Sequence, residues 1–511
     1  MALHGTNGGS AIVTVSTDGS YIVRVHGKEV SVHSAIPVEG SHFLRSIKLQ
    51  EAFSSQLKFV KVSQSDSTAD GNSGTRMQIE DESQLNLVSQ RRLLCASSNR
   101  ILVWQINSLE WHADIENIEP SVGTIEFGAS DDEAILFHSW SSKVTIFNLE
   151  SASSLIIKSP KFYNPSSMGH GYRPLTRQLA ILLKPEASDL LTIHEACSYD
   201  TIAKVTLPTV DAQGLKWSPD GRWIAIWDAA SNGTKVLVYT ADGQLYRAYT
   251  GRSDIENTHD LGVKCIEWTP LKRRHSNSEI LAVGKYDGTV DLLNTRTFSC
   301  STTLSHTFSI NDKSPPVWRE RMSPDGKLEY AEAASSSAFV TPGSDSTIQL
   351  PKGVSSLQFS PHGELLATIE QTQPNIVWIW AMTATPTLET ALVHEHNVKN
   401  ITWHAKNQEL LITTANNTLA VIHLWSKERP PVIAEIPIPR SEAGRYSVTW
   451  VKSTVPEESC LFWFNNTDDA VLGCVIVDDQ TNTQGRASFN SLYMVSRSGL
   501  MGAPAETSGA N

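Results

Sequence analysis

Asp18, Asp220 and Asp287 are among the aspartates that stand directly before a glycine, where a carboxylate either holds a turn or joins others at a shared site. An aspartate in such a turn accepts hydrogen bonds from nearby backbone amides and so fixes the hairpin. We therefore interpret all three as turn residues. The sequence alone leaves open whether their carboxylates also converge on a common axis.

Histidines are the other residues whose grouping would allow chemistry, as metal ligands. His194, His394, His396 and His404 match no ligand spacing, and the six cysteines lie far apart with no C-x-x-C pair. The chain has no P-loop, no G-x-G-x-x-G after a strand, no G-x-S-x-G and no H-E-x-x-H. The sequence therefore predicts a protein without enzymatic activity, metal or other cofactor.

Composition and charge narrow the class of protein further. Hydrophobic residues make up 40% of the chain, charged residues 19%, and 14 tryptophans are present, which suits a packed core. The net charge is −12, and Lys272 to His275 is the one compact basic segment, so direct binding of nucleic acid is disfavoured. The start of the chain does not resemble a signal peptide, and no apolar run reaches about 18 residues. We expect a soluble, intracellular protein that does not bind membranes.

The elements that position these residues recur along the chain as a strand, turn, strand, turn, strand pattern. In the clearest unit, residues 215–240, Leu215 and Trp217 alternate with polar neighbours, and Ser218 to Gly221 have the composition of a tight turn. Two further apolar strands follow, the last of them ending at Tyr239. The same order of elements returns in residues 262–294, 353–380 and 398–425.

Weaker copies bring the number of units to nine. They cover residues 15–34, 91–107, 123–150, 175–195 and 445–477. Units of this size cannot bury their faces alone and must stack on neighbours, as the blades of a propeller do. Nine units predict an all-β, WD40-type β-propeller array, either one large ring or one ring plus an incomplete second. One strand position carries an aromatic residue in five units, which we predict to pack between blades: Trp217, Trp268, Phe359, Trp403 and Trp450.

The pattern also predicts how the chain is divided. Residues 10–310 form blades one to six, with a polar insertion at 63–86. Residues 311–352 form an inserted linker, and residues 353–480 form blades seven to nine. Residues 481–511 form a C-terminal tail that is largely coil.

Several segments resemble a known family in order along the chain. They are VWQINSLEWHADI (103–115), LKWSPDGRWIAIWD (215–228), SIND (309–312), FSPHGELLAT (359–368) and PNIVWIW (374–380). Together they resemble the spindle-pole and centrosomal WD-repeat family often called WD-repeat protein eight, over residues 12 to 477. The insertion at 63–86 departs from that family's shorter connection.

This resemblance implies a location and partners. The location is the cytoplasm and cytoskeleton, at the spindle pole body or centrosome. There a scaffold of this family helps to hold microtubule minus ends and to organise the spindle. The partners implied are a coiled-coil minus-end anchoring protein and, in some lineages, a minus-end-directed kinesin.

Two kinds of site are predicted outside the well-formed repeats. Protein interfaces depend on a few aromatic and arginine anchors, and the candidates here are Trp111, Trp318, Arg319 and Arg321. Ser-Pro steps in flexible segments are candidate phosphorylation sites, because a phosphate adds about −1.5 to −2 charge and can change partner binding. The candidates of this kind are Ser159 and Ser314.

Two other functions remain as alternatives. Large propellers also occur among RNA- or ribosome-associated factors in translation initiation, which would require a basic face. A hydrolase centred on the channel of the propeller would require a carboxylate or metal cluster on its axis.

Overall fold

The computed structural model describes most of the chain. The described residues are 12–63, 91–107, 111–119, 121–162, 168–252, 260–271, 279–306, 315–333, 352–437, 446–452, 460–466, 468–478 and 486–495. The predicted insertion at 63–86 lies outside them apart from Ser63.

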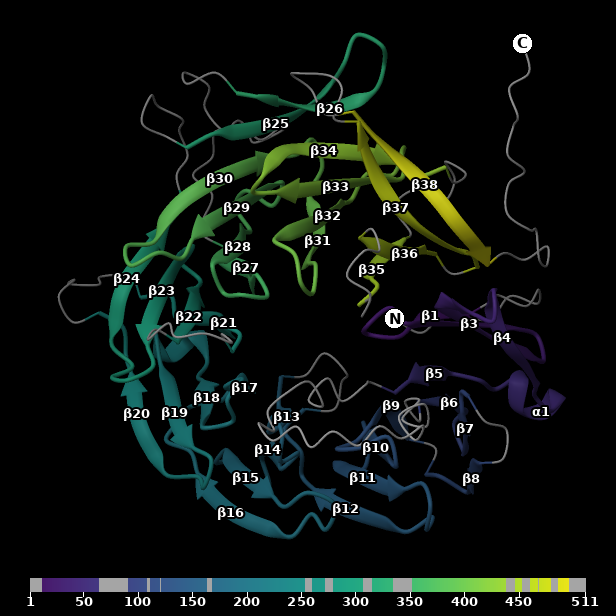
Figure 1. Ribbon diagram of the computed structural model, residues 1–511. Helices are drawn as coiled ribbons and strands as arrows, with labels where there is room; N and C mark the ends of the chain where they lie inside the picture. The colour runs from purple at the N-terminus through teal and green to yellow at the C-terminus, as the bar shows by residue number, and fades with distance from the viewer. Residues whose placement is uncertain are drawn as a thin grey trace, which may run out of the picture.

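Nine sheets stand side by side around one axis, and each contains four consecutive strands paired antiparallel (Figure 1). Blades one to three contain β1 (Ile12–Val15), β2 (Tyr21–His26), β3 (Glu29–Val38), β4 (Ser41–Lys48), β5 (Phe59–Val62), β6 (Arg92–Ala96), β7 (Arg100–Gln105), β8 (His112–Glu116), β9 (Val122–Phe127), β10 (Glu133–His138), β11 (Lys143–Asn148) and β12 (Ser154–Lys158). Blades four to six contain β13 (His170–Tyr172), β14 (Leu179–Leu183), β15 (Leu190–His194), β16 (Thr201–Thr206), β17 (Gly214–Trp217), β18 (Trp223–Trp227), β19 (Val236–Thr240), β20 (Leu245–Tyr249), β21 (Val263–Trp268), β22 (Ile280–Lys285), β23 (Thr289–Asn294) and β24 (Cys300–Ser305).

Blades seven to nine complete the ring. They contain β27 (Val354–Phe359), β28 (Leu365–Glu370), β29 (Ile376–Ala381), β30 (Thr387–Val393), β31 (Val398–Trp403), β32 (Glu409–Thr414), β33 (Val421–Ser426), β34 (Arg429–Glu435), β35 (Ser447–Trp450), β36 (Leu461–Asn465), β37 (Ala470–Asp478) and β38 (Arg486–Val495). The first strand of each blade lies nearest the axis and the fourth lies on the outer rim (Figure 1). The expected fold is confirmed, and the choice left open is decided in favour of one nine-bladed ring.

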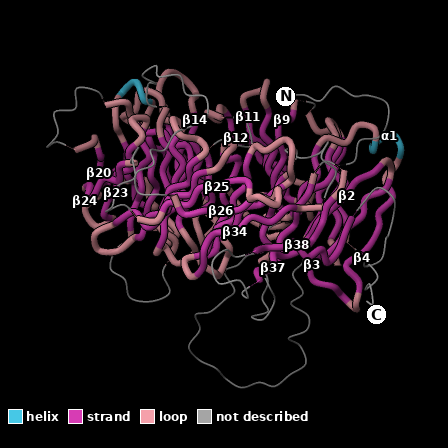
Figure 2. The backbone as a smooth tube through the Cα atoms, turned by 90° about the horizontal axis from the view of Figure 1, so that it is seen from above, coloured by secondary structure: helices cyan, strands magenta, loops and turns pink. Residues whose placement is uncertain are grey.

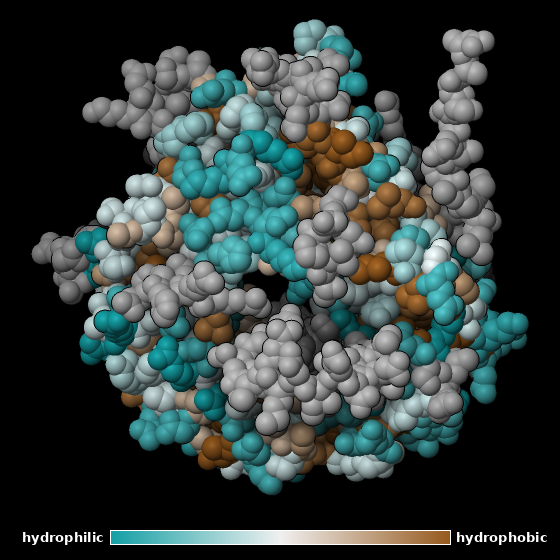
Figure 3. All heavy atoms as spheres, viewed as in Figure 1, coloured by the Kyte–Doolittle hydropathy of each residue, from teal (hydrophilic) through white to brown (hydrophobic). Residues whose placement is uncertain are grey.

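Helical structure in the described residues is limited to short turns, α1 (Glu51–Ser54) and the 3-10 turn η2 (Ala230–Asn232). No helix there is long and apolar enough to cross a membrane. Seen from above, the strands form one band, with loops on both sides of it (Figure 2). An opening lies near the axis on the face shown in Figure 3.

Two predicted boundaries differ from the structure. Within the predicted linker 311–352, a hairpin of β25 (Val317–Met322) and β26 (Leu328–Glu332) extends the sheet of blade seven to six strands. Within the predicted tail 481–511, β38 forms the outer strand of blade nine. Ser323 to Gly326 in the hairpin repeat the turn sequence of Ser218 to Gly221, so the first segment carried a turn signal that the prediction did not use. Both segments pair with a neighbouring strand of their blade.

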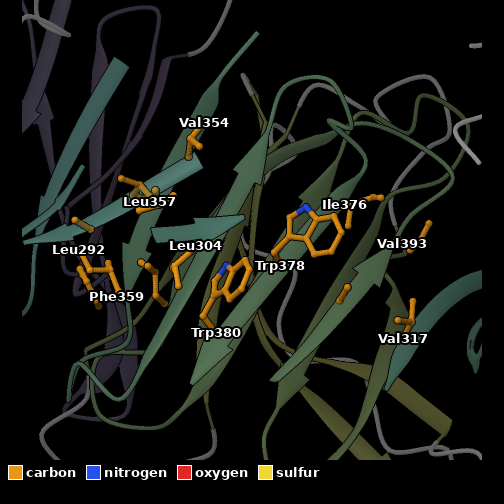
Figure 4. Packing of buried hydrophobic residues seen from close by; sticks show 14 residues of the cluster. Leu292, Leu304, Val317, Val354, Leu357, Phe359, Ile376, Trp378, Trp380 and Val393 are labelled. Carbon is orange, nitrogen blue, oxygen red and sulfur yellow. The ribbon is translucent and has the colours of Figure 1, made fainter. Parts of the chain in front are cut away.

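The core consists of apolar clusters between neighbouring blades. The cluster between blades six and seven places Trp378 and Trp380 of β29 beside Phe359, Leu304 of blade six and Val317 of the hairpin (Figure 4). Trp378 is fully buried. Each large apolar side chain buried in this way stabilises the fold by about 1.5–3 kcal/mol, so each blade depends on its neighbours for most of its stability.

Candidate interaction sites on a closed ring

The predicted aromatic position joins successive blades by a repeated hydrogen bond. The indole Nε1 of Trp268 donates to the carbonyl oxygen of Lys216 at 3.2 Å, and that of Trp450 donates to Thr402 at 3.0 Å. Trp217 and Trp403 make the same bond to Gly171 and Gln358. In each case the acceptor directly precedes the aromatic residue of the preceding blade. The prediction that these residues belong to the core is confirmed. The structure adds that the tryptophans among them join neighbouring blades through hydrogen bonds.

Blade seven is tied to blade six by a chain of buried polar groups. The ring nitrogen Nδ1 of His306 lies 2.6 Å from the carbonyl oxygen of Gly288, so Nδ1 carries the proton. Nε2 therefore accepts from the Thr368 hydroxyl at 2.9 Å, and the Thr368 oxygen accepts from the Trp380 indole at 3.0 Å. Burial lowers the pKa of His306, which favours the neutral form that this arrangement requires.

The ring closes where blade nine meets blade one, without a shared strand. The Trp463 indole donates to the carbonyl oxygen of Gly19 at 2.8 Å, and the Lys452 amide donates to that of Asp18 at 2.8 Å. Gly19 has φ +69°, and a Cβ there would lie 2.3 Å from the carbonyl oxygen of Trp450. Closure thus requires a glycine in this turn.

The three aspartates hold turns, as predicted. Asp18, Asp220 and Asp287 each accept the backbone amide two residues further along the chain. Asp18 also forms a buried ion pair with Arg91 of blade two at 2.5 Å. Burial alone raises the pKa of Asp18, but the hydrogen bonds and charge of Arg91, with Ser16 and Ser20, lower it to about 2.

Two of the four histidines named in the sequence hold local structure. His194 bonds the Tyr199 carbonyl oxygen and the Thr192 hydroxyl, and His404 Nδ1 accepts two backbone amides in a turn. Among the described residues, no group of three or more histidine, cysteine or acidic side chains has the geometry to hold a metal ion. The six cysteines are free thiols.

Three of the four predicted anchor residues lie together on β25. This strand pairs in parallel with the outer strand β30 of blade seven, Val317 opposite Ala391 and Arg319 opposite Val393. The sequence did not predict this pairing, because its partners are more than 70 residues apart in the chain. Strand alternation turns Trp318 and Arg319 to opposite faces of the hairpin.

One face of the hairpin packs on the ring and the other meets solvent. Trp318 is half-buried against the clusters of blades seven and eight. Arg319 and Arg321 line a hollow of about 130 Å³ with Ala331, Glu332 and Ala333. The guanidinium of Arg321 forms an ion pair with Glu329 at 2.8 Å. Arg321 is exposed on this face, whereas Arg319 and Trp318 are both half-buried, less exposed than anchor residues were expected to be.

Trp111 lies apart from the hairpin, between blades two and three. It is half-buried, and the guanidinium carbon of Arg92 lies 3.8 Å from the centre of its ring. Arg92 also pairs with Asp132 of blade three. Trp111 thus has a packing role in this ring, while its role in partner binding remains a prediction.

A polar cluster joins the inward face of the hairpin to the ring, and the sequence analysis did not predict it. Tyr330 of β26 is buried, and its hydroxyl lies 2.8 Å from His394 Nε2 and 3.2 Å from His423 Nδ1. His394 Nδ1 donates to the Asn375 carbonyl oxygen, so its Nε2 accepts the Tyr330 proton and His423 donates to the Tyr330 oxygen. Burial lowers the pKa of His394 to about 4, and burial with the nearby His394 and His396 lowers the pKa of His423 well below its usual value, so both are neutral.

Glu320 of β25 lies beside this cluster with an exposure of only 3%. One carboxylate oxygen accepts the Glu395 amide at 3.1 Å, and the other has no hydrogen-bond partner. Burial, with the nearby charge of Glu395, raises the pKa of Glu320 to about 7. The alternation of VWRERM in residues 317–322 is the signal that places Glu320 on the same face as Trp318.

The two serine candidates have different outcomes. Ser159 directly follows β12 and has φ 56°. Its amide donates to the Ser142 carbonyl oxygen, and its own carbonyl oxygen accepts the Lys184 amide of blade four. It is therefore part of an ordered junction and not of the flexible segment expected. Ser314 lies outside the described residues. Phosphorylation of either serine remains a prediction.

Nine blades, each with four strands around the axis and joined by aromatic and polar contacts, define a nine-bladed β-propeller of the WD-repeat class. The comparisons with known proteins agree with this class. Mouse WD repeat-containing protein WRAP73 is 28% identical over 360 residues, covering 65% of this chain and 73% of the mouse protein. A WD repeat-containing protein of Schizosaccharomyces pombe is 24% identical over 327 residues, covering 63% of this chain and 63% of that protein, less than two thirds of its length.

The chain is thus similar to two WD repeat-containing proteins over about two thirds of its length. No family model matches it. Among solved structures, a crystal structure of a eukaryotic initiation factor superimposes with a TM-score of 0.51 at 10% sequence identity, over 84% of this chain and 89% of that one. At this level of identity the likeness concerns the fold alone.

Proposed function

We propose that this propeller is a protein-interaction scaffold at microtubule-organising centres, where it supports anchoring of microtubule minus ends. The observation that carries the proposal is the match to WRAP73 over 65% of this chain, together with the segments that resemble, in sequence order, the spindle-pole and centrosomal family. The partners proposed are a coiled-coil anchoring protein and a minus-end-directed kinesin. The expected location is the spindle pole body or centrosome.

The ring supports this proposal as a rigid platform. Its blades are tied by buried aromatic and polar bonds, so surface loops and outer strands keep fixed relative positions. Among the described residues, the carboxylates considered for chemistry, such as Asp18 and Asp220, hold turns. A scaffold requires fixed surfaces of this kind and no catalytic group.

Affinity purification of the full chain, followed by mass spectrometry and by imaging of a fluorescent fusion through mitosis, tests the proposal. We expect spindle-pole components in the purified material and signal at the poles. Recovery of translation factors in place of these components, with salt-sensitive binding of total RNA on filters, would favour the RNA-associated alternative and overturn the proposal.

The hairpin face is the first surface to test for partner binding. Reversing the charge of Arg319 and Arg321 to glutamate should reduce recovery of the coiled-coil partner while leaving the fold intact. Lys28→Glu on blade one is the matched control, because Lys28 is also an exposed cation with one acidic neighbour, Glu51. Equal recovery with both variants would exclude the hairpin arginines as anchors.

A further inference from the structure

The outer rim between blades five and six carries exposed apolar and cationic side chains next to one another. The fourth strand of blade five, β20, is the last strand of its sheet, and in the described residues no further strand pairs with it. Its first four residues are exposed. Leu245 and Tyr246 have exposures of 48% and 49%, so two adjacent large apolar side chains of this strand meet solvent.

A β-bulge turns this segment toward blade six. Arg247 pairs with Val238 and Leu245 pairs with Tyr239, so Tyr246 is the extra residue between them. A bulge re-aims the side chains beside it. As a result, the Tyr246 hydroxyl donates to the Arg296 carbonyl oxygen at 3.1 Å, and Arg247 Nε donates to that of Thr297 at 3.0 Å.

Tyr246 is held in one orientation although half of it meets solvent. Its ring centroid lies 4.6 Å from that of Trp223 and 5.9 Å from that of Phe298, which is buried. A rigid aromatic side chain loses little conformational entropy when a partner covers it. The same property distinguishes anchor residues in protein interfaces from ordinary exposed side chains.

Two arginines stand beside this aromatic surface. Arg247 and Arg296 are exposed, and within the described part of the chain neither forms an ion pair with an acidic side chain. Arg222 nearby differs, because it pairs with Asp220 and Glu279. In a chain with a net charge of −12, two arginines without carboxylate partners form a local surface complementary to negative charge.

We propose that Leu245, Tyr246, Arg247 and Arg296, the blade five–six patch, bind an acidic segment of a protein partner that also carries apolar side chains. Carboxylates of the segment pair with the two arginines, and its apolar side chains cover Leu245 and Tyr246. Blade seven shows the kind of occupant that a fourth strand can accept, since β25 lies in parallel against β30 there. An extended segment along β20 would use the same open edge.

Fluorescence anisotropy with a short labelled peptide of alternating leucine and glutamate tests this site on the full chain. We expect the peptide to bind and the double variant R247E/R296E to bind at least about tenfold more weakly, because loss of two charged anchors at a hot spot typically costs that much. A peptide with lysine in place of glutamate should not bind. Raising the salt concentration should weaken binding of the acidic peptide, because salt screens the attraction between opposite charges.

Lys204→Glu is the matched control. Lys204 is an exposed cation on β16, the fourth strand of the neighbouring blade four, so its reversal changes the net charge without touching the patch. Unchanged circular dichroism and thermal unfolding of R247E/R296E exclude loss of folding as the cause of weaker binding. Tyr246→Ala, which keeps both arginines, should also weaken binding.

Failure of the acidic peptide to bind, or equal binding by R247E/R296E and the unmodified chain, would overturn the proposal. The inference rests on the scaffold role proposed above, but the two fail separately. If the peptide does not bind, the patch is excluded as a binding site, and the outcome of the purification experiment is unaffected. Recovery of translation factors by that experiment leaves the peptide result standing.

Discussion

Replacing Glu320 by glutamine should stabilise the protein at alkaline pH. Glu320 is buried under the β25–β26 hairpin, with one carboxylate oxygen bonded to the Glu395 amide and the other without a partner. Glutamine has the same shape and can keep the bond to Glu395 through its own oxygen. It carries no charge at any pH, so the cost of burying a carboxylate is removed.

The magnitude follows from the pKa of Glu320. A rise from 4.5 to about 7 on folding corresponds to a cost of about 3 kcal/mol once the carboxyl group is ionised in both states. Because the folded pKa is the higher one, the contribution of Glu320 is fully present below about pH 4.5. It is lost progressively as pH rises to about 7, where the folded state also ionises.

Thermal unfolding of both proteins between pH 5 and pH 8 measures this effect. The unfolding entropy is about 2.1 cal/mol/K per residue, so in a chain of 511 residues a gain of about 3 kcal/mol raises Tm by about 3 °C at pH 8. The difference in Tm should fall toward zero near pH 5. His394 and His423 titrate in both proteins, so their effect cancels in the comparison. Hydrogen exchange of β25 and β26 shows whether the gain lies in the hairpin.

Glu332→Gln is the control, since Glu332 lies on the same hairpin but is exposed. A Glu320→Gln protein no more stable than the unmodified chain at pH 8 would refute the reasoning. So would a gain that is equal at pH 5 and pH 8, because the physical cause is ionisation of a buried carboxyl group.

Three further substitutions test other contacts. Gly19→Ala should lower the free energy of unfolding by about 1–3 kcal/mol more than Gly27→Ala does. Both glycines have positive φ, but only a Cβ at Gly19 meets the backbone of blade nine. Equal denaturation midpoints of the two variants would contradict this. Trp268→Phe should lower the free energy of unfolding by about 1–3 kcal/mol, since the carbonyl oxygen of Lys216 loses its indole donor, and urea unfolding measures the change. Tyr330→Phe should speed hydrogen exchange of β25 and β26 with little effect on the other blades, because it removes the hydroxyl bonded to both histidines; unchanged exchange in the hairpin would show that apolar packing alone seats it.

Much of the fold was predictable because its information is local. The turn of Ser218 to Gly221, the alternation around Trp217 and the repeated aromatic position are encoded by residues close together in the chain. These features gave nine repeat units, the blade positions and the turn role of Asp18, Asp220 and Asp287. They also placed the interior residues on the correct strands.

The candidate site was predictable only in part. Arg319 and Arg321 were found from their residue types, but the hairpin that presents them was interpreted as a linker. Its turn, Ser323 to Gly326, could be read from the sequence, but its parallel pairing with β30 joins segments far apart in the chain, and an isolated hairpin is only marginally stable. The bulge that places Tyr246 and Arg247 beside Arg296 depends on a neighbouring blade in the same way.

The sequence by itself determined the repeating unit, because strand alternation and turn chemistry are properties of adjacent residues. Only the tertiary structure decided that nine units close into one ring, that Trp463 meets Gly19 across the ends of the described chain, and that Glu320 is buried with neutral histidines nearby. Closure and burial depend on the shapes of surfaces that exist only after the blades have stacked, so no local pattern specifies them.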